Sequence, residues 1–227
     1  MGQAVLSRTE TLEDYVRKRC SLLAVIALAG VRQSFGGRCT VYTEGMEKSA
    51  FGLPSFCVMG SSLPHRLLYS LHYFTQFFSI IYAVLRIGER FNLAIGVGTF
   101  YTCMALLLKR LGLLDHVIYY AIDYYPAKNF LNKIFTRMDS ICFRSADVVW
   151  NLSAPIMNVR HLNLGIARPG KEIIVPLSYP AKTLTVRAIS EIERWSIAYA
   201  GVIDELHGIQ LAIEALPEVL RCLPNVV

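Results

Sequence analysis

Short apolar runs alternate with helix-like patterns along most of this chain. The first run, residues 22–29, is continuously apolar, which is typical of a strand covered on both faces. Strands that alternate with helices are typical of a parallel sheet whose strands are joined by crossover helices. The pattern therefore predicts an α/β fold, with a parallel sheet and helices on both of its faces.

Glycine, proline and capping residues divide the pattern into elements. Helices are predicted over residues 11–18, 66–87, 100–111, 131–143, from 155 onward, and over 209–220. Strands are predicted over residues 22–29, 40–43, 93–97, 117–122, 148–151, 173–176 and 196–200, with another beginning at 226. Gly112 is predicted to end its helix in the left-handed conformation, and Ser153 to cap the helix that follows it. Residues 44–64 are rich in Gly, Pro and Ser and are predicted to be irregular, with a strand at 55–59 left open.

The longest predicted helix, residues 66–87, carries two stripes. Its apolar stripe recurs at steps of four and three and consists of Leu67, Leu71, Phe74, Phe78, Ile81 and Leu85. A more polar stripe, which includes His72, Gln76 and Ser79, follows the same rhythm on another face. A helix packed on a sheet can carry a polar stripe, whereas a helix surrounded by lipid has no use for one. The pattern favours a packed helix, while the length of the segment leaves a membrane span through 66–87 as the alternative.

Composition and charge narrow the class of protein. The chain has 227 residues, of which 54% are hydrophobic and 18% charged, and this excludes a disordered protein. The net charge is +6, but the basic residues are scattered and do not alternate with aromatic residues as in a nucleic-acid-binding surface. No nucleic-acid partner is predicted. Three interpretations of the charge stay open: attraction to an anionic membrane surface, attraction to a phosphorylated substrate, or an ordinary solvated surface.

The six cysteines lie far apart in the sequence, without the spacing of a metal site. No metal or other cofactor is predicted. The first apolar run is not followed by a small-residue cleavage pattern, so a secretory signal is not predicted. Reduced thiols in a cytoplasmic protein are the expectation from these features.

Two segments resemble a known family. Residues 145–153, SADVVWNLS, are similar to an "aD-vw-S" element in the first domain of retaining glycosyltransferases of the GT-B fold. Residues 197–225 are similar to the strand, glycine, loop and helix that begin the second domain of these enzymes. The order and separation of the two segments match the family. The chain thus resembles the group 1, family 4-like glycosyltransferases, cut off after the start of the second domain.

The resemblance implies a two-domain architecture and an activity. Residues 1–182 would form a Rossmann-like, acceptor-side domain, and residues 183–227 a linker and the first β-α unit of an incomplete nucleotide-sugar-binding domain. The expected function is transfer of a sugar from a nucleotide-sugar donor to a sugar or lipid-linked acceptor. The expected location is the cytoplasm, with peripheral attachment to the inner face of the membrane. The family's pair of donor-site glutamates is not matched here, so the isolated chain is expected to be inactive.

Three residues beyond the strand at 117–122 are candidates for the acceptor site. Asp123 is the candidate catalytic residue, because a carboxylate at this edge can orient an acceptor hydroxyl, although an Asx-turn is the alternative. Tyr124 could offer a face for sugar stacking or simply anchor its loop, and Lys128 could contact a charged acceptor or simply begin a helix. Asp139 and Asp147 could be read as paired carboxylates, but Asp147 is predicted instead to close the turn into its strand.

The resemblance also implies a donor site in the second domain. Gly201 would bring the backbone close to the donor phosphates, or serve only as a turn. His207 stands near the place where the family has a lysine and could donate a hydrogen bond to phosphate, with Gly208 beside it. The alternative to an enzyme is a non-catalytic, Rossmann-like binding domain.

Overall fold

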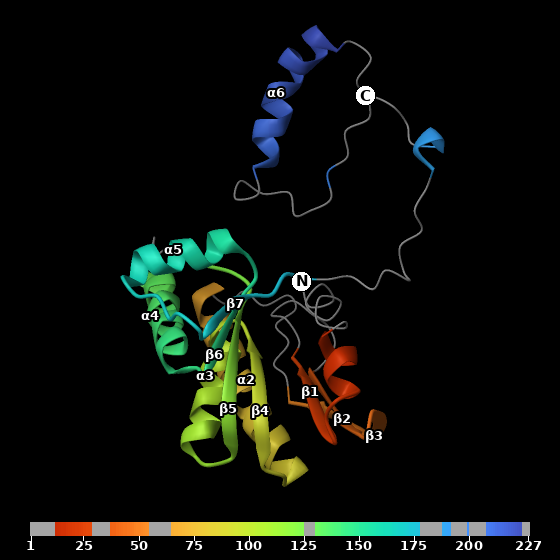
Figure 1. The fold of residues 1–227 in the computed structure, drawn as a ribbon, viewed down its shortest axis with the longest axis vertical. Coiled ribbons are helices and arrows are strands. Elements are labelled where there is room, and N and C mark those ends of the chain that lie inside the picture. The colour runs from red at the N-terminus through yellow and green to blue at the C-terminus, as the bar shows by residue number, and fades with distance from the viewer. Residues whose placement is uncertain are drawn as a thin grey trace. The chain divides into compact units, whose positions relative to one another are not determined.

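The computed structural model describes residues 12–28, 37–54, 65–124, 130–177, 188–191, 199 and 208–223. The chain divides into two compact units, Met1–Tyr179 and Pro180–Val227. Figure 1 shows the elements of both units. The predicted boundary after residue 182 stays a prediction, and each unit is described by itself.

A four-stranded parallel sheet forms the larger part of the first unit. Its order is β4-β5-β6-β7, and the strands are Phe91–Val97, Leu114–Ala121, Val148–Asn151 and Glu172–Ile174. The helices between them are α3 (Thr99–Arg110), α4 (Phe130–Ser145) and α5 (Ala154–Leu164). Every neighbouring pair of strands is parallel. The unit therefore has the predicted Rossmann-like α/β fold, with a parallel sheet flanked by helices.

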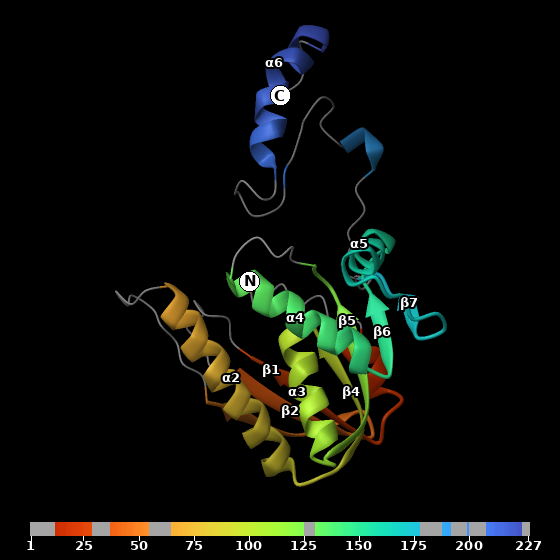
Figure 2. The same cartoon turned by 90° about the vertical axis from the view of Figure 1, so that its left-hand side faces the viewer.

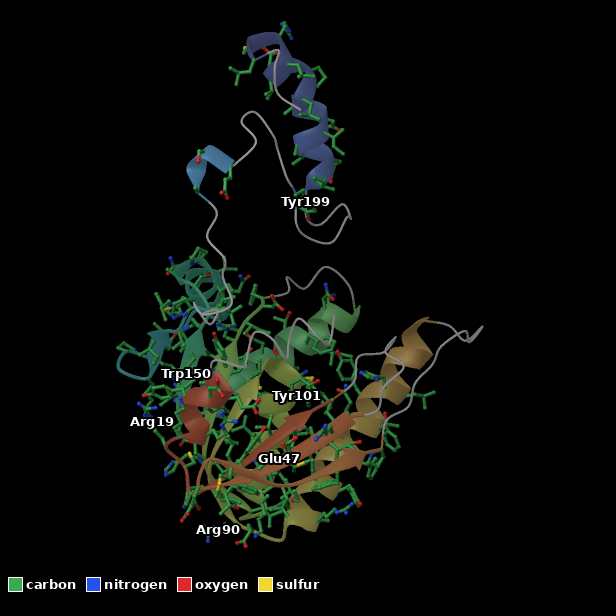
Figure 3. All side chains as sticks on the ribbon, turned by 90° about the vertical axis from the view of Figure 1, so that its right-hand side faces the viewer. Arg19, Glu47, Arg90, Tyr101, Trp150 and Tyr199 are labelled. Atoms are coloured by element: carbon green, nitrogen blue, oxygen red, sulfur yellow. The ribbon has the colours of Figure 1, made fainter. Side chains whose placement is uncertain are left out.

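A second sheet, which is antiparallel, precedes the parallel one and corrects two predictions. It consists of β1 (Leu22–Ala27), β2 (Gly37–Thr43) and β3 (Met46–Leu53). The first apolar run is thus not a strand of the parallel sheet, and residues 46–53 are not irregular. Glu47 marks β3 in Figure 3, where this sheet faces the viewer.

Local sequence explains why β3 was missed. Its first five residues are all exposed, so the strand lacks the alternation of apolar and polar residues that predicts a half-buried strand. Glu44 and Gly45 join β2 to β3 with φ of 51° and 80°, the two-residue turn with positive φ that is typical of tight hairpins. A glutamate in the first of these positions is a weak hairpin signal. The strand left open at 55–59 lies outside the described residues.

Two apolar clusters hold the first unit together. The larger one is formed by α3, α4 and the parallel strands, and Val117, Phe143 and Val149 in it are fully buried. The smaller one joins the antiparallel sheet to α2 (His65–Ile87) through Cys39, Val41, Leu53 and Ala83. Figure 2 shows α2, α3 and α4 on the same side of the strands.

Helix α2 packs against the protein, as predicted. However, its polar stripe is buried and much of its apolar stripe is exposed, the reverse of the expected arrangement. Phe74, Phe78 and Leu85 are 61%, 50% and 64% exposed, whereas His72, Gln76 and Ser79 are buried. Among the described residues, no helix combines the length and apolar character needed to cross a membrane.

The buried polar side chains of α2 make hydrogen bonds to one another and to the backbone. The side chains of His72 and Gln76 are bonded to each other at 2.7 Å. The Ser79 hydroxyl donates to the Thr75 carbonyl, and it also lies against the Pro54 carbonyl. Because buried polar groups cost little once they are bonded, this stripe can face the protein. Ile80 and Val84, which lie beside it, supply the apolar contacts with the core.

The second unit contains a 3-10 turn at Ile189–Glu191 and the helix α6, Ile209–Cys222. Helix α6 confirms the helix predicted over 209–220. The strand predicted over 196–200 lies outside the described residues except for Tyr199, and the strand predicted from 226 lies wholly outside them.

Candidate functional site

The carboxyl ends of the parallel strands form the candidate site. Because β4, β5 and β6 are parallel, the residues that follow them lie at one edge of the sheet, where open α/β sheets bind ligands. Thr99 and Asp123 come from two of these ends, and Tyr124 follows Asp123. They line a hollow of about 10 Å³ together with Phe135, Thr136 and Asp139 of α4. This volume suits about one water molecule.

Thr99 is placed there by the turn from β4 into α3. Gly98 has φ of 85°, a conformation that a residue with a side chain rarely adopts, and its N–H donates to the Tyr120 carbonyl at 2.8 Å. The turn therefore ties the start of α3 to the end of β5. Asp123 is exposed and Tyr124 is half-buried, so both are open to a ligand at this edge.

A buried ion pair lies directly beneath the hollow. Arg160 of α5 is fully buried, and Asp139 of α4 is 5% exposed. The Arg160 guanidinium donates from Nε to Asp139 Oδ2 at 3.1 Å and from Nη2 to Asp139 Oδ1 at 3.2 Å. A two-point bond of this kind fixes the relative orientation of both groups. It fixes α5 against α4 at the edge of the sheet.

The ion pair belongs to a longer network of buried polar groups. Arg160 Nη1 donates to Asn151 Oδ1 at the end of β6, at 2.5 Å. The Tyr119 hydroxyl donates to Asp139 Oδ1 at 2.5 Å, so Thr99 Oγ1, 3.1 Å away, acts as donor to that hydroxyl. Burial, together with the charge of Asp139, raises the pKa of Tyr119 far above its ordinary value. Tyr119 therefore stays protonated and remains a donor at physiological pH.

Aromatic rings surround the Arg160 guanidinium. The rings of Tyr119, Tyr124 and Phe143 lie 5.5, 5.9 and 6.0 Å from its central carbon. A cation within about 6 Å of a ring centre is attracted to the ring. The Arg160 guanidinium thus helps to hold the ring of Tyr124, a predicted sugar-stacking residue, in place.

Asp147 lies at the opposite end of β5 and does not belong to the site. Its carboxylate accepts from Val117 N at 2.7 Å and from Lys109 Nζ at 2.7 Å. Burial alone would raise the pKa of Asp147, but these two bonds, together with the charges of Lys109 and His116, outweigh it and lower the pKa. Asp147 thus stands directly before β6, as predicted, but its carboxylate joins this turn to β5 and to Lys109 of α3 instead of capping the turn itself.

Only some of the predicted site residues lie at the carboxyl edge in the described part of the chain. Asp123 and Tyr124 lie together at the hollow. Gly208, with φ of 69°, is the N-cap of α6 in the second unit. Lys128, Gly201 and His207 lie outside the described residues.

Sequence reasoning missed the part that Asp139 and Arg160 play. On α4, Asp139 shares its face with Phe135, Cys142 and Phe143, which follow the spacing of a buried stripe. A charged residue on such a face needs a partner, and Arg160 is the charged residue of α5 whose side chain is buried. The sequence does contain a signal for this ion pair: one acidic and one basic residue, each on the buried face of one of two successive helices.

A larger cavity, of about 350 Å³, lies between β1 and β4. Its described lining is apolar apart from a few residues, among them Glu13 and Tyr101. Burial raises the pKa of Tyr101 to about 12, so its hydroxyl stays neutral. Glu13 is the lone charged residue among the described lining, and it accepts a bond from Tyr42 at 2.9 Å. This lining offers little polar chemistry, so the carboxyl edge is the better candidate site.

Metal binding finds no support at either place. Among the described residues, no three side chains of His, Cys, Asp or Glu come together in a way that could hold a metal ion.

Comparisons with known proteins leave the chain's own residues as the basis for function. A scan against models of known protein families finds no match, and a comparison with curated protein sequences finds none either.

Proposed function

We propose that the first unit is the acceptor-side domain of a nucleotide-sugar-dependent glycosyltransferase. The observation that carries the proposal is the pairing of Asp123 with Tyr124 at the carboxyl edge of a parallel sheet. A carboxylate beside an aromatic face is suited to a sugar, because the ring stacks on the aromatic face while a hydroxyl donates to the carboxylate.

Each residue has a distinct part in this proposal. The Asp123 carboxylate accepts the hydrogen bond of the acceptor hydroxyl and orients it toward the donor. Tyr124 stacks on the acceptor ring. Asp139 and Arg160 neutralise each other below the site and act as positioning residues. The donor contacts expected at Gly201, His207 and Gly208 remain part of the proposal, with a nucleotide-sugar as the donor.

Saturation-transfer NMR with methyl glycosides of glucose, mannose and N-acetylglucosamine is expected to detect binding by the chain. Asp123→Asn is expected to weaken that binding about tenfold or more, because a hydrogen bond to a charged acceptor is lost. Asp115→Asn is the matched control, since Asp115 is bonded to Arg90 and Asn92 near the start of β5. Equal binding by wild type and Asp123→Asn would contradict the assignment.

A non-catalytic binding domain is the second candidate. It is favoured by the way the polar groups of the site bond to one another, which leaves a hollow of only about 10 Å³. Calorimetry with UDP- and GDP-sugars separates the two candidates, because the transferase is expected to bind a nucleotide-sugar even where the isolated chain does not turn it over. Binding of the methyl glycosides without binding of either nucleotide-sugar favours the binding domain.

Peripheral attachment to an anionic membrane surface is the second part of the proposal. The exposed stripe of α2 consists of Phe74, Phe78, Tyr82 and Leu85. Arg86 follows it and places its guanidinium over the rings of Phe51 and Tyr82, at 4.3 and 5.8 Å. Aromatic and aliphatic side chains with basic residues beside them are the features by which helices bind anionic lipid surfaces.

Vesicle flotation tests this attachment. The chain is expected to float with vesicles of phosphatidylcholine and phosphatidylserine, and less with phosphatidylcholine alone. The double variant Phe74→Asp/Phe78→Asp is expected to bind about tenfold more weakly or worse, because two apolar anchors are lost. Leu162→Asp is the control, since Leu162 of α5 is 84% exposed and lies outside the stripe. Equal loss in both variants, or no binding by wild type, would rule out attachment through α2.

A further inference from the structure

Two cysteines from neighbouring helices are in contact beneath the candidate site. Cys103 lies on α3 and Cys142 on α4, and their sulfur atoms are 3.3 Å apart. Cys142 is fully buried, whereas Cys103 is half-buried. The pair is separated by 39 positions in the sequence, so spacing alone gave no sign of it.

The surroundings give the two thiols different chemistry. The hydrogen bond from Cys142 lowers the pKa of Cys103, and this effect outweighs burial and the charge of Asp139. The pKa of Cys142 is raised, chiefly by the same bond. The thiolate is the reactive form of cysteine, so the half-buried Cys103 is the first sulfur to react.

We propose that Cys103 and Cys142 form an oxidation-sensitive pair, which a hydroperoxide converts to a disulfide between α3 and α4. The Cys103 thiolate attacks the peroxide, its O–O bond breaks, and Cys103 becomes a sulfenic acid. Cys142 then attacks the Cys103 sulfur, the S–S bond forms, and the sulfenic oxygen leaves as water. Two thiols are oxidised and one peroxide is reduced: hydrogen peroxide gives two waters, and an organic hydroperoxide gives one alcohol and one water. A dithiol reverses the step by thiol–disulfide exchange.

The geometry requires little movement. The sulfur–sulfur distance must fall from 3.3 Å to about 2.05 Å. Helices α3 and α4 already pack against each other in the larger apolar cluster. Side-chain rotation with a small approach of the two helices is therefore sufficient.

Oxidation of the cysteine pair would remove one hydrogen bond to a residue of the candidate site. While Cys103 is protonated, the single proton of Cys142 is available to the Thr99 carbonyl, 3.4 Å away, and a disulfide has no proton to donate. Thr99 lines the hollow and bonds to Tyr119. The redox state of the pair thus changes the bonding of a residue at the edge of the sheet. The proposal itself does not depend on the proposed function.

Peptide mapping tests the pair without any mutation. The reduced chain is treated with hydrogen peroxide, alkylated, and digested without a reductant. Mass spectrometry is expected to find the peptides of Cys103 and Cys142 joined, with two free thiols lost per chain and regained with dithiothreitol. The melting temperature of the oxidised chain is expected to rise by several degrees, because a cross-link over this separation restricts the unfolded chain. Joined peptides from other cysteines in place of these, or no joined peptides, would overturn the proposal.

Single variants test the order of the steps. In Cys142→Ala, Cys103 is expected to stop at the sulfenic acid, which dimedone labels. In Cys103→Ala, dimedone labelling of Cys142 is expected to be at least about tenfold lower, since Cys142 is buried. Cys222→Ser, which removes an exposed thiol on α6, is the control and should oxidise as wild type does. Equal labelling of Cys103 and Cys142 in the two alanine variants would refute the assigned order.

Discussion

Replacing Arg160 with methionine is expected to lower the free energy of unfolding of the first unit by about 3–5 kcal/mol. Arg160 is fully buried and donates to both oxygens of Asp139. Methionine has a similar length, so the variant removes the charge and the hydrogen bonds with a small change in volume. The Asp139 carboxylate would then be left buried without its cation, and this is the main source of the loss. Urea unfolding followed by circular dichroism measures the change.

A partly exposed ion pair supplies the control for this prediction. Lys109 and Asp147 are 32% and 36% exposed and lie 2.7 Å apart. Lys109→Met is expected to cost less than about 1 kcal/mol, because water replaces the lost partner. A loss of the same size in both variants would mean that burial of Asp139 is not the cause.

The double variant separates the charge from the packing. Replacing Arg160 with methionine and Asp139 with leucine removes both charges, so no buried carboxylate is left unpaired. Apolar replacements of whole buried ion pairs are often neutral or stabilising. The double variant is therefore expected to regain part of the loss seen in Arg160→Met, although Tyr119 and Asn151 lose a partner. A double variant less stable than Arg160→Met would contradict this account.

Elements with strong local signals could be predicted from the sequence. The predicted strand at 148–151 has the observed bounds of β6, and the helix at 100–111 differs from α3 by one residue at each end. Gly112 adopts φ of 74° after α3, as predicted. Ser153 occupies the N-cap position of α5, but its hydroxyl makes no capping bond. Apolar runs and glycine ends are local features, and they survive in the fold because packing agrees with them.

Features that depend on distant partners could not be predicted. The buried stripe of α2 is stabilised by a bond from Ser79 to the Thr75 carbonyl and by contact with Pro54, which lies 25 positions away. The hairpin of β2 and β3 depends on pairing between strands more than on an apolar pattern. In both cases tertiary contacts override the local pattern.

The candidate site was predictable only in part, for the same reason. Asp123 and Tyr124 follow a strongly predicted strand, so their place at the edge of the sheet follows from chain order alone. Asp139 and Arg160 lie in the middle of helices, and their pairing depends on how α4 and α5 pack. Residues that end strands can be assigned to a site from the sequence, whereas the buried groups that position them require the structure.

Gly96 gives the second large effect: Gly96→Ala is expected to lower the free energy of unfolding by about 3 kcal/mol. A Cβ on this residue of β4 would lie 2.5 Å from Thr102 Oγ1, 2.6 Å from Thr102 Cα and 2.8 Å from Thr102 N. Two of these three atoms are backbone atoms of α3, so no side-chain rotation relieves the contact. The helix would have to move away from the strand, and the bond from Thr102 Oγ1 to the Gly96 carbonyl, 2.9 Å long, would be strained.

Two further variants decide whether the backbone of α3 is the obstacle at Gly96. Gly52→Ala is the matched control, because Gly52 is also a strand glycine and nothing lies within 4 Å of its Cβ position; its cost is expected to stay below about 0.5 kcal/mol. Adding Thr102→Ala to Gly96→Ala is expected to restore no stability, since the Cα and N of residue 102 remain in the way. If urea unfolding showed that the double variant regains wild-type stability, the clash would lie with the threonine side chain. The close approach of β4 to α3 would then not require glycine.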